Sequence, residues 1–451
     1  MKTHPAKPRV AIACGGTGGH IFPGLAVANQ LLQRGCAVTL LISPKEIDQQ
    51  AVKGVSGVDI AVLPAIGLSR GGKIGFLRGF IRSFYRVREI FRAQPPHAVL
   101  AMGGFTAAPP VFAARLAGLP AFLHESNTIP GRANRLLARF VTRAFVGFPQ
   151  TEKNLAARAV SVTGTPVRPE FQPLSAEVSR RELGFQPDRP VVLVMGGSQG
   201  ASGINDLVLA ALPLLTKQLS ELQWLHLTGA DDFERVRKAH AAQGNVHHAV
   251  VLPFLPRMDL ALAAATVAVS RAGASSLAEL ATMRVPALLV PYPTATDNHQ
   301  WHNARAFEAT DAAVLLEQST TTVVQFATEL TKLLQDPVRR AQMVLALAEW
   351  HKPEAAGQIA DEILNVVAAR LGRKMSPNAS VASVPDTLMV TIDGRDQPWS
   401  GFRFTPASVG ANPMMSHHYL SGPKCVFPAD GDTVRKLPAT ELLATAETLP
   451  A

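Results

Sequence analysis

The chain has 451 residues, of which 47% are hydrophobic and 17% are charged. This composition excludes an intrinsically disordered protein, because it supplies enough apolar side chains to bury a large core. At roughly 150 residues per domain, two or three domains are expected.

Charge is unevenly distributed along the chain. The formal net charge is +10, but residues 1–160 carry 20 basic and 6 acidic residues, residues 161–370 carry 17 and 21, and residues 371–451 carry 7 of each. The basic excess therefore lies in the first third, which favours an anionic partner for that part of the protein. A nucleic acid is disfavoured, because only 6% of the residues are aromatic and no recognition motif is present.

Neither a disulfide framework nor a membrane span is predicted. The three cysteines, Cys14, Cys36 and Cys425, are too few for a disulfide scaffold and lack metal-ligand spacing. The apolar residues 10–14 are too short for a signal sequence, and no run of about 18 uncharged apolar residues occurs. We expect a cytosolic protein that at most lies on a membrane surface.

The first half of the chain has the pattern of a parallel α/β sheet. A short strand at Val10–Ala13, a glycine turn, an amphipathic helix at Leu25–Leu32 and a strand at Ala37–Ile42 form a strand–helix–strand unit. Such alternation predicts a parallel sheet with helices on both faces. Further elements are expected as strands at Ala98–Ala101, Ala121–His124 and Ala144–Val146, and as a helix at Arg132–Arg139.

The same order recurs after the proline-rich stretch Thr165–Pro169. A strand at Val191–Met195 is followed by a glycine loop at Gly196–Gly200 and a helix at Asn205–Leu215. The recurrence predicts two Rossmann-like halves rather than one large sheet. Further strands are expected at Trp224–Leu227, Val250–Leu252, Thr266–Val269 and Ala287–Val290, with helices at Thr322–Leu334 and Ala356–Ala369. Residues 376–451 are rich in Pro, Ser, Thr, Ala and Gly, which indicates a tail of low order.

The glycine loop Gly15–His20 is a candidate anion-binding site. Consecutive backbone N–H groups at the start of a helix suit a phosphate or a developing anion, although a tight turn whose glycines serve only packing is the alternative. Ile21 stands where the dinucleotide fingerprint needs its third glycine, and no Lys-Ser/Thr pair of a P-loop follows. A nicotinamide dehydrogenase and ATP-dependent phosphoryl transfer are therefore disfavoured.

A second candidate is the segment Ser270–Glu279, which again combines a strand end, a small-residue turn and a helix start. The amides and hydroxyls of Ala274–Ser276 suit a diphosphate, and Glu279, one turn later, suits a ribose diol. A plain capped helix is equally consistent with this pattern.

Asp297–Ala304 concentrates polar residues after a predicted strand, at the edge where ligands bind in such sheets. His299 and His302 lack a third ligand nearby, so a metal site is only weakly supported.

Seven segments together resemble one family closely: Gly15–Ala26, Gly103–Phe105, His124–Asn127, Gly164–Arg168, Gly196–Ala201, Ser270–Glu279 and Asp297–Ala304. In order, over about residues 8–370, they are similar to the MurG-type UDP-N-acetylglucosamine:lipid I N-acetylglucosaminyltransferases of bacterial peptidoglycan synthesis. Ser126 stands where the family commonly has Gln, and His299 replaces the first of two glutamines, with one residue inserted upstream. The residues past Arg370 have no counterpart in the family pattern.

The resemblance implies an α/β fold of the GT-B class, with two Rossmann-like domains facing across a cleft and a poorly ordered C-terminal tail. Residues 1–164 would serve the acceptor lipid and the membrane, residues 165–370 the donor, and residues 371–451 form a low-complexity tail of unknown role. It further implies an inverting transfer of GlcNAc, without metal or other cofactor, from UDP-GlcNAc to the C4 hydroxyl of undecaprenyl-diphosphate-linked MurNAc-pentapeptide (lipid I), giving lipid II. The enzyme would be peripheral, on the cytoplasmic face of the inner membrane.

The resemblance also implies site residues. Donor contacts fall on Thr17, Gly18, Gly19, Asn127, Arg168, Ser198, Leu255, Ala274, Ser275, Ser276, Leu277, Ala278, Glu279 and Gln300. Apart from what the resemblance implies, we expect acceptor or membrane contacts at Gly103, Gly104, His124, Glu125, Lys73, Arg78, Arg82 and Arg86.

We assign the catalytic base to His20. Inverting transfer needs a base for the acceptor proton, and a helix start disfavours the imidazolium and keeps the ring neutral. A role for His20 in capping or packing the loop is the alternative, and His124 and Glu125 are competing bases. Stabilisation of the leaving diphosphate is expected from helix N-termini, from Arg168 and from the serine hydroxyls.

The segment Leu68–Arg92 accounts for much of the basic charge. Arg78, Arg82 and Arg86 share one helical face, and Phe76, Leu77, Phe80, Ile81 and Phe84 are apolar. A solvated face over a core stripe is the ordinary meaning of this pattern, but the clustering favours a surface that contacts anionic lipid headgroups.

Two other kinds of function stay open at this level. One is a different GT-B enzyme, such as another glycosyltransferase or a UDP-sugar 2-epimerase. The other is a non-catalytic, membrane-attached nucleotide-sugar sensor or scaffold, against which the presence of both His20 and Gln300 argues mildly.

Overall fold

The computed structural model describes residues 7–65, 68–197, 199–244, 248–372, 389–392 and 395–398. The chain divides into two compact units, Met1–Ala379 and Ser380–Ala451. Of the second unit, the structure describes an antiparallel pair of strands, β14 (Met389–Ile392) and β15 (Arg395–Pro398). The rest of the segment predicted as a tail lies outside the described residues.

The first half of unit 1 contains a seven-stranded parallel sheet in the order β3-β2-β1-β4-β5-β6-β7. Its strands are β1 (Arg9–Ala13), β2 (Ala37–Ile42), β3 (Val58–Val62), β4 (Ala98–Ala101), β5 (Ala121–Glu125), β6 (Arg143–Val146) and β7 (Val160–Val162). The five central strands confirm the predictions. The edge strands β3 and β7 were not predicted, because they are partly exposed and lack the continuous apolar run of a strand buried on both faces.

Five α-helices follow strands of this half. They are α1 (Gly18–Gln33), α2 (Glu46–Ala51), α3 (Leu68–Ala93), α4 (Ala108–Leu116) and α5 (Arg132–Leu137), with 3-10 turns η1 (Ala138–Phe140) and η2 (Pro149–Asn154). Helix α1 begins at Gly18, so the predicted start at Leu25 was wrong: the last glycines of the loop already belong to the first turn. Helix α3 is interrupted at Gly72, whose φ of 56° is left-handed.

The second half contains a six-stranded parallel sheet in the order β10-β9-β8-β11-β12-β13. Its strands are β8 (Val191–Met195), β9 (Gln223–Leu227), β10 (Ala249–Leu252), β11 (Val267–Ser270), β12 (Ala287–Leu289) and β13 (Val314–Leu315). All but the two-residue strand β13 were predicted. The helices are α6 (Ala176–Glu182), α7 (Ser202–Gln218), α8 (Phe233–Ala242), α9 (Met258–Ala264), α10 (Ala274–Met283), α11 (His299–Glu308) after the 3-10 turn η4 (Thr296–Asn298), α12 (Val323–Gln335), α13 (Pro337–Trp350) and α14 (Ala355–Arg370).

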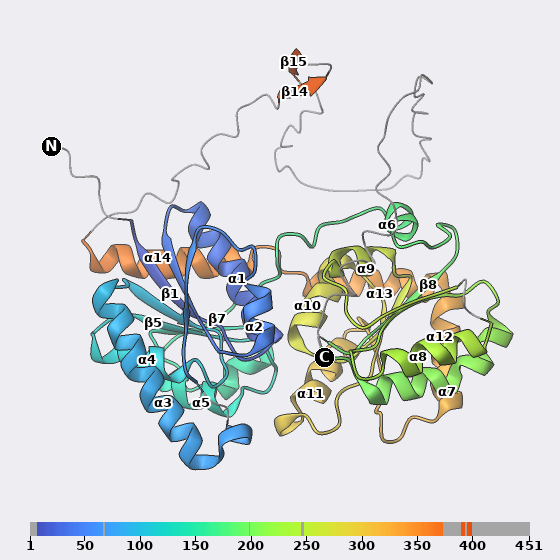
Figure 1. The fold of residues 1–451 in the computed structure, drawn as a ribbon, viewed down its shortest axis with the longest axis horizontal. Coiled ribbons are helices and arrows are strands. Elements are labelled where there is room, and N and C mark those ends of the chain that lie inside the picture. The colour runs from blue at the N-terminus through green and yellow to red at the C-terminus, as the bar shows by residue number, and fades with distance from the viewer. Residues whose placement is uncertain are drawn as a thin grey trace, which may run out of the picture. The chain divides into compact units, whose positions relative to one another are not determined.

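Helix α14 returns to the first half. Figure 1 shows it beside α1, and Ile359 and Ile363 belong to the same buried core as Val27 and Leu31 of α1. Arg34 at the end of α1 also forms an ion pair with Asp361, at 2.6 Å. The chain therefore passes between the halves twice, after β7 and between α13 and α14. The boundary at residues 164 and 165 stays a prediction, since the last helix of the range assigned to the second half packs on the first.

Two histidines are buried in the second half. The Nδ1 atom of His226 lies 3.2 Å from Nε2 of His240, and its Nε2 atom lies 3.0 Å from Oδ1 of Asn205. The Asn205 amide donates to the Thr228 carbonyl at 3.0 Å, beside the glycine loop 196–200. Burial lowers the pKa of His226 to about 3 and that of His240 to about 4, so both rings are neutral in the folded protein.

This burial predicts acid sensitivity of folding. In the unfolded chain these histidines become protonated near pH 6.5, whereas in the folded chain they stay neutral at that pH. Their contribution to the free energy of unfolding is therefore fully present above pH 6.5 and is lost as the pH falls toward the pKa values of the folded protein. The slope is about 1.4 kcal/mol per pH unit for each histidine. We expect His240→Gln to reduce the slope of the unfolding free energy between pH 6.5 and 5 by about that amount, measured by urea titration. An unchanged slope contradicts the prediction.

Candidate active site

Three cavities adjoin at the first glycine loop and share Thr17 as a lining residue. We call them cavity I, of about 330 Å³, cavity II, of about 400 Å³, and cavity III, of about 610 Å³. Ser275 lines cavities I and II, and His20 lines cavities II and III. The predicted base therefore lies where the second and third cavities meet.

Cavity I brings together the groups predicted to bind a diphosphate and a ribose. Its polar lining residues come from both halves: Thr17, Gly18, Gly19, Arg168, Gly196, Gly197, Ser275, Ser276 and Glu279. Helix α10 begins at Ala274, so its first-turn amides lack intrahelical partners and are directed toward this space. The cavity thus combines a helix N-terminus, three hydroxyl side chains and a cation.

Arg168 is the cation of cavity I. Its guanidinium carbon lies 4.2 Å from the ring centroid of Phe22 and 4.9 Å from that of Phe171, which fixes its plane. It pairs with Glu170 at 3.1 Å and with Glu279 at 3.6 Å. Burial raises the pKa of Glu279 to about 7, against the opposing charge of Arg168. Glu279 is thus an acceptor held next to a fixed positive charge.

Helices α1 and α10 touch at their N-terminal turns. Pro23 of α1 has no N–H, so the carbonyl of Gly19 loses the donor that an α-helix normally supplies four residues later. The Ser275 hydroxyl of α10 donates to this carbonyl at 3.4 Å. The contact joins the two halves beside the cavities.

Gln300 lines cavity II, and a backbone hydrogen bond fixes the orientation of its side chain. Its Oε1 atom accepts a hydrogen bond from the Tyr292 backbone N–H at 2.9 Å, which leaves its amide nitrogen for a ligand. The Tyr292 loop is held by buried Arg271, which donates to the carbonyls of Val290 at 2.9 Å and Pro291 at 3.0 Å. Arg271 also lies 5.4 Å from the Tyr292 ring centroid. Sequence reasoning had given Arg271 no role.

The loop before α11 forms the opposite rim of cavity II. His299 Nδ1 lies 2.8 Å from the Thr296 carbonyl, so that nitrogen carries the proton in the neutral ring. Asp297 has a left-handed φ of 52° and pairs with Arg135 at 2.5 Å and with Arg132 at 3.3 Å, both on α5. These ion pairs connect the second half to the first across the cavity opening.

His20 lies in the first turn of α1 and packs against two glycines. A Cβ atom at Gly103 would lie 3.1 Å from His20 Nε2, and one at Gly104 would lie 3.0 Å from its Cε1, and both glycines have positive φ. Nδ1 of His20 lies 3.0 Å from the Thr17 hydroxyl, whereas no described residue forms a hydrogen bond with Nε2. Burial lowers the pKa of His20 to about 4, against the opposing charge of Asp48. The ring is therefore neutral at pH 7, with Nε2 available.

His124 and Glu125 use their polar atoms within the protein. His124 is fully buried, with Nε2 3.1 Å from the Gly164 carbonyl and Nδ1 3.2 Å from the Ser126 hydroxyl. The Glu125 carboxylate lines cavity III but accepts four hydrogen bonds: from the N–H and side chain of Asn127, from the N–H of Gly131 and from the Asn134 amide. This arrangement disfavours both as bases and indicates that they shape the loop.

Two buried residues that sequence reasoning missed support the site. Asn303 accepts from the backbone and hydroxyl of Thr128 and donates to Asn127 Oδ1 at 3.0 Å, so it fixes a predicted donor residue from the other half. Asp48 accepts from the Gly16 N–H at 2.6 Å and from Ser43, which holds the first glycine loop. Asn303 lies within the polar segment Asp297–Ala304, but nothing in the sequence around Asp48 signals its contact.

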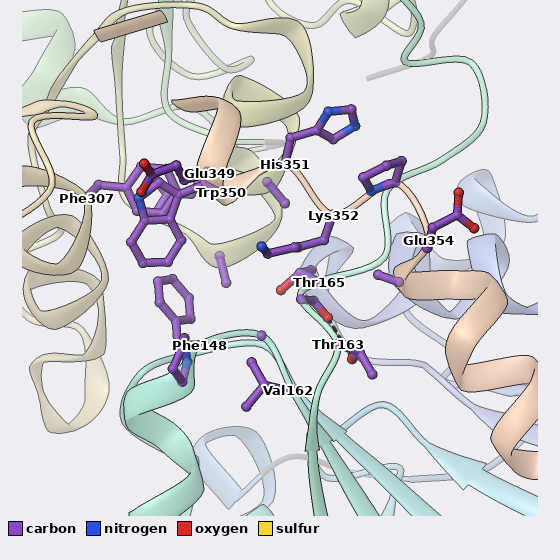
Figure 2. A pocket seen from close by; sticks show the side chains of 18 of the residues that line it. Phe148, Val162, Thr163, Thr165, Phe307, Glu349, Trp350, His351, Lys352 and Glu354 are labelled. Carbon is purple, nitrogen blue, oxygen red and sulfur yellow. Dashed lines mark hydrogen bonds between the residues drawn. The ribbon is translucent and has the colours of Figure 1, made fainter. Parts of the chain in front are cut away.

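Three predicted donor residues do not line these cavities. The side chains of Leu277 and Ala278 line a separate cavity of about 520 Å³ on the other side of α10, shown in Figure 2, into which Lys352 extends. Leu255 packs on the core of the second half, while its neighbours Phe254 and Pro256 line cavity I. Ser198 lies outside the described residues. The side chain of Lys73, predicted as an acceptor or membrane contact, lies outside them too.

Helix α3 exposes both its arginines and part of its apolar surface. Arg78, Arg82 and Arg86 are exposed, as are Ile74, Leu77, Ile81 and Tyr85. The face toward the core instead carries Ser83 and Val87, both fully buried. The apolar residues of this helix are therefore only partly a core stripe. Within the described ranges, no helix is long and apolar enough to cross a membrane.

Known proteins resemble this chain over nearly all of the described core. Residues 10–146 match the glycosyltransferase family 28 N-terminal domain, and residues 191–359 match the C-terminal domain of that family. A UDP-N-acetylglucosamine–N-acetylmuramyl-(pentapeptide) pyrophosphoryl-undecaprenol N-acetylglucosamine transferase of Anaeromyxobacter is 37% identical over 81% of this chain and 95% of its own length. A protein of the same name from Nitratidesulfovibrio vulgaris is 40% identical over 80% and 98%.

A solved structure agrees with these relatives. The crystal structure of MurG from Acinetobacter baumannii has 30% sequence identity and a TM-score of 0.63, and the match covers 79% of this chain and 99% of that one. The predicted GT-B architecture of two Rossmann-like halves is thereby confirmed. The chain belongs to glycosyltransferase family 28, and within it to the UDP-N-acetylglucosamine–N-acetylmuramyl-(pentapeptide) pyrophosphoryl-undecaprenol N-acetylglucosamine transferases.

Proposed function

We propose that the chain transfers GlcNAc from UDP-GlcNAc to the C4 hydroxyl of MurNAc-pentapeptide on undecaprenyl diphosphate, forming lipid II from lipid I. The names of its relatives give the substrates. The observation that carries the proposal is the position of His20, a neutral base with a free Nε2, where cavities II and III meet. A donor in cavities I and II and an acceptor in cavity III would meet at this ring.

The donor would occupy cavities I and II. Its diphosphate would bind the first-turn amides of α10 and the hydroxyls of Ser275 and Ser276, next to Arg168. Glu279 would accept hydrogen bonds from the ribose diol. The sugar would then extend past Thr17 into cavity II, toward Asn127 and Gln300.

The transfer would proceed as one displacement at the anomeric carbon. The acceptor oxygen forms the new C–O bond while the bond to UDP breaks, the hydroxyl proton passes to Nε2 of His20, and UDP leaves with the bonding electron pair. Attack from cavity III on a sugar held in cavity II, with the diphosphate leaving into cavity I, would invert the anomeric centre. The saturated hydrogen bonding of Glu125 supports this path over one with a carboxylate nucleophile.

The leaving UDP would be stabilised by protein groups rather than a metal. Arg168 and the α10 N-terminus supply positive charge where the diphosphate develops its own negative charge. Among the described residues, no three His, Cys, Asp or Glu side chains lie together so that they could hold a metal ion. The positive groups of cavity I are what support the proposal of a metal-independent transfer.

We also propose that the enzyme lies peripherally on the cytoplasmic face of the inner membrane. The exposed arginines and apolar side chains of α3 suit an anionic headgroup layer, and Phe76 of the same helix lines cavity III. The first half would therefore receive the lipid acceptor and the second half the donor.

Replacing His20 by Ala tests the assignment of the base. We expect the turnover number to fall about 10²- to 10⁴-fold, the usual contribution of general base catalysis, while UDP-GlcNAc affinity changes little. The measurements are transfer of radiolabelled GlcNAc to lipid I and calorimetric binding of the donor. His124→Gln serves as a comparison that retains His20. Near-normal turnover of His20→Ala would remove this residue from the mechanism.

Replacing Arg271 by Met tests whether Arg271 orients Gln300. We expect affinity for UDP-GlcNAc to fall about tenfold, the value of one hydrogen bond to a charged or well-placed group, with little change for UDP, which does not reach cavity II. The additional change Gln300→Ala should then cost nothing further, because both substitutions remove the same interaction. Equal losses for UDP and UDP-GlcNAc would show a general structural defect instead.

Reversing the charge of α3 tests the membrane surface. We expect the triple variant Arg78→Glu, Arg82→Glu, Arg86→Glu to lose binding to anionic vesicles, since each basic residue near such a surface contributes about 1 kcal/mol, and we expect wild-type binding to weaken with salt. A triple reversal of exposed Lys217, Arg237 and Lys238 in the second half is the matched control. Equal binding of both variants would contradict the proposed orientation.

A further inference from the structure

Lys45 is a cation of cavity III that the protein leaves without a counter-ion. It is half-buried at the N-terminal end of α2, and its ammonium donates to the Gly16 carbonyl at 2.6 Å. The same ammonium lies 5.2 Å from the ring centroid of Phe105. In the described part of the chain no carboxylate forms an ion pair with it. An ammonium has three N–H donors, so two of them stay available at the cavity wall.

The other charged groups of cavity III are already committed. Glu125 accepts four hydrogen bonds within its own loop. Arg132 pairs with Asp297, and its side chain is 78% exposed. Among the described residues, Lys45 is therefore the half-buried cation of this wall that no carboxylate pairs with. The contact with Phe105 favours a position at the wall over one in solvent.

The chemistry of the acceptor requires an anion in this cavity. The attacked hydroxyl is on C4 of the MurNAc ring, and the diphosphate is on C1, the carbon opposite C4. With C4 at His20, the diphosphate lies across the ring from the base, on the way to the lipid. Lys45 lines the same cavity as His20 and as Phe76 of the exposed helix α3.

We propose that Lys45 binds the diphosphate of the polyprenyl-linked acceptor and thereby selects acceptors that carry this anion. The inference rests on the proposed function and adds a residue to its acceptor side. A lysine suits the role because its compact charge can contact oxygens of either phosphate without a fixed planar geometry. The hydrogen bond to the Gly16 carbonyl places this charge beside the first glycine loop. His20 lies just after that loop, in the first turn of α1.

The test compares two soluble acceptors with wild-type and variant full-length enzyme. Both carry MurNAc-pentapeptide and a short prenyl chain, joined in one by a diphosphate and in the other by an uncharged linker of equal length. Lys45→Met retains the chain length over Phe105 and removes the charge, and Lys45→Arg retains the charge. Lys53→Met, at an exposed lysine beyond α2, is the matched control.

For Lys45→Met we expect the KM for the diphosphate acceptor to rise tenfold to a hundredfold, while the KM for UDP-GlcNAc and the KM for the uncharged acceptor stay within twofold. Lys45→Arg should recover most of the loss, and Lys53→Met should behave as wild type. If Lys45→Met impairs both acceptors equally, Lys45 only supports the glycine loop and the proposal is overturned. If wild-type enzyme transfers to neither acceptor, the proposed function itself fails.

Discussion

The approach of two helix N-termini from different halves determines the rest of the site. Helix α1 of the first half and helix α10 of the second begin beside the same cavities and touch through the Ser275 hydroxyl and the Gly19 carbonyl. Each N-terminus carries a partial positive charge and unpaired N–H groups. Two such ends close together repel each other unless an anion lies nearby. A donor diphosphate in cavity I would satisfy both ends, so its binding would also favour the association of the two halves.

Close packing around the base sets a second constraint. His20 lies against Gly103 and Gly104, and a Cβ atom at either would contact its ring at about van der Waals limits or closer. Burial of the ring in these surroundings is the main cause of its lowered pKa. Gly103 and Gly104 therefore leave the space that the His20 ring occupies.

Sequence reasoning found the elements that are buried on both faces and the motifs at their ends. The central strands β1 and β8 were predicted within their observed bounds. A short continuous apolar run followed by glycine is typical of a buried strand that ends in a turn. Most of the residues that the resemblance assigns to the donor line cavities I and II, since the carboxyl ends of parallel strands meet at one edge. Leu277 and Ala278 do not, because successive residues of a helix point in different directions and only one face of α10 lines cavity I.

The supporting residues could not be found in the same way. Asp48 and Arg271 act on backbone atoms of Gly16 and Pro291, and such contacts leave no pattern in side-chain type or spacing. Asp48 also lies next to Gly15, at which a Cβ atom would clash with it. The role of the acid can therefore be recognised only once the position of the glycine loop is known. Lys45 could not be singled out from the sequence either, because the role proposed for it depends on the cavity that it lines.

The site offers an explanation for the difference in net charge between the two halves. The second half is acidic overall, yet its share of cavity I is positive, because a helix terminus supplies charge that composition does not count. In the first half, by contrast, exposed basic side chains are spread along α3, as the proposed contact with a membrane surface requires. Phe76 of α3 and Lys45 line the same cavity as His20. A lipid diphosphate entering from α3 would thus meet an attractive potential continuously up to His20, and the basic excess of residues 1–160 would guide the acceptor as well as hold the protein at the membrane.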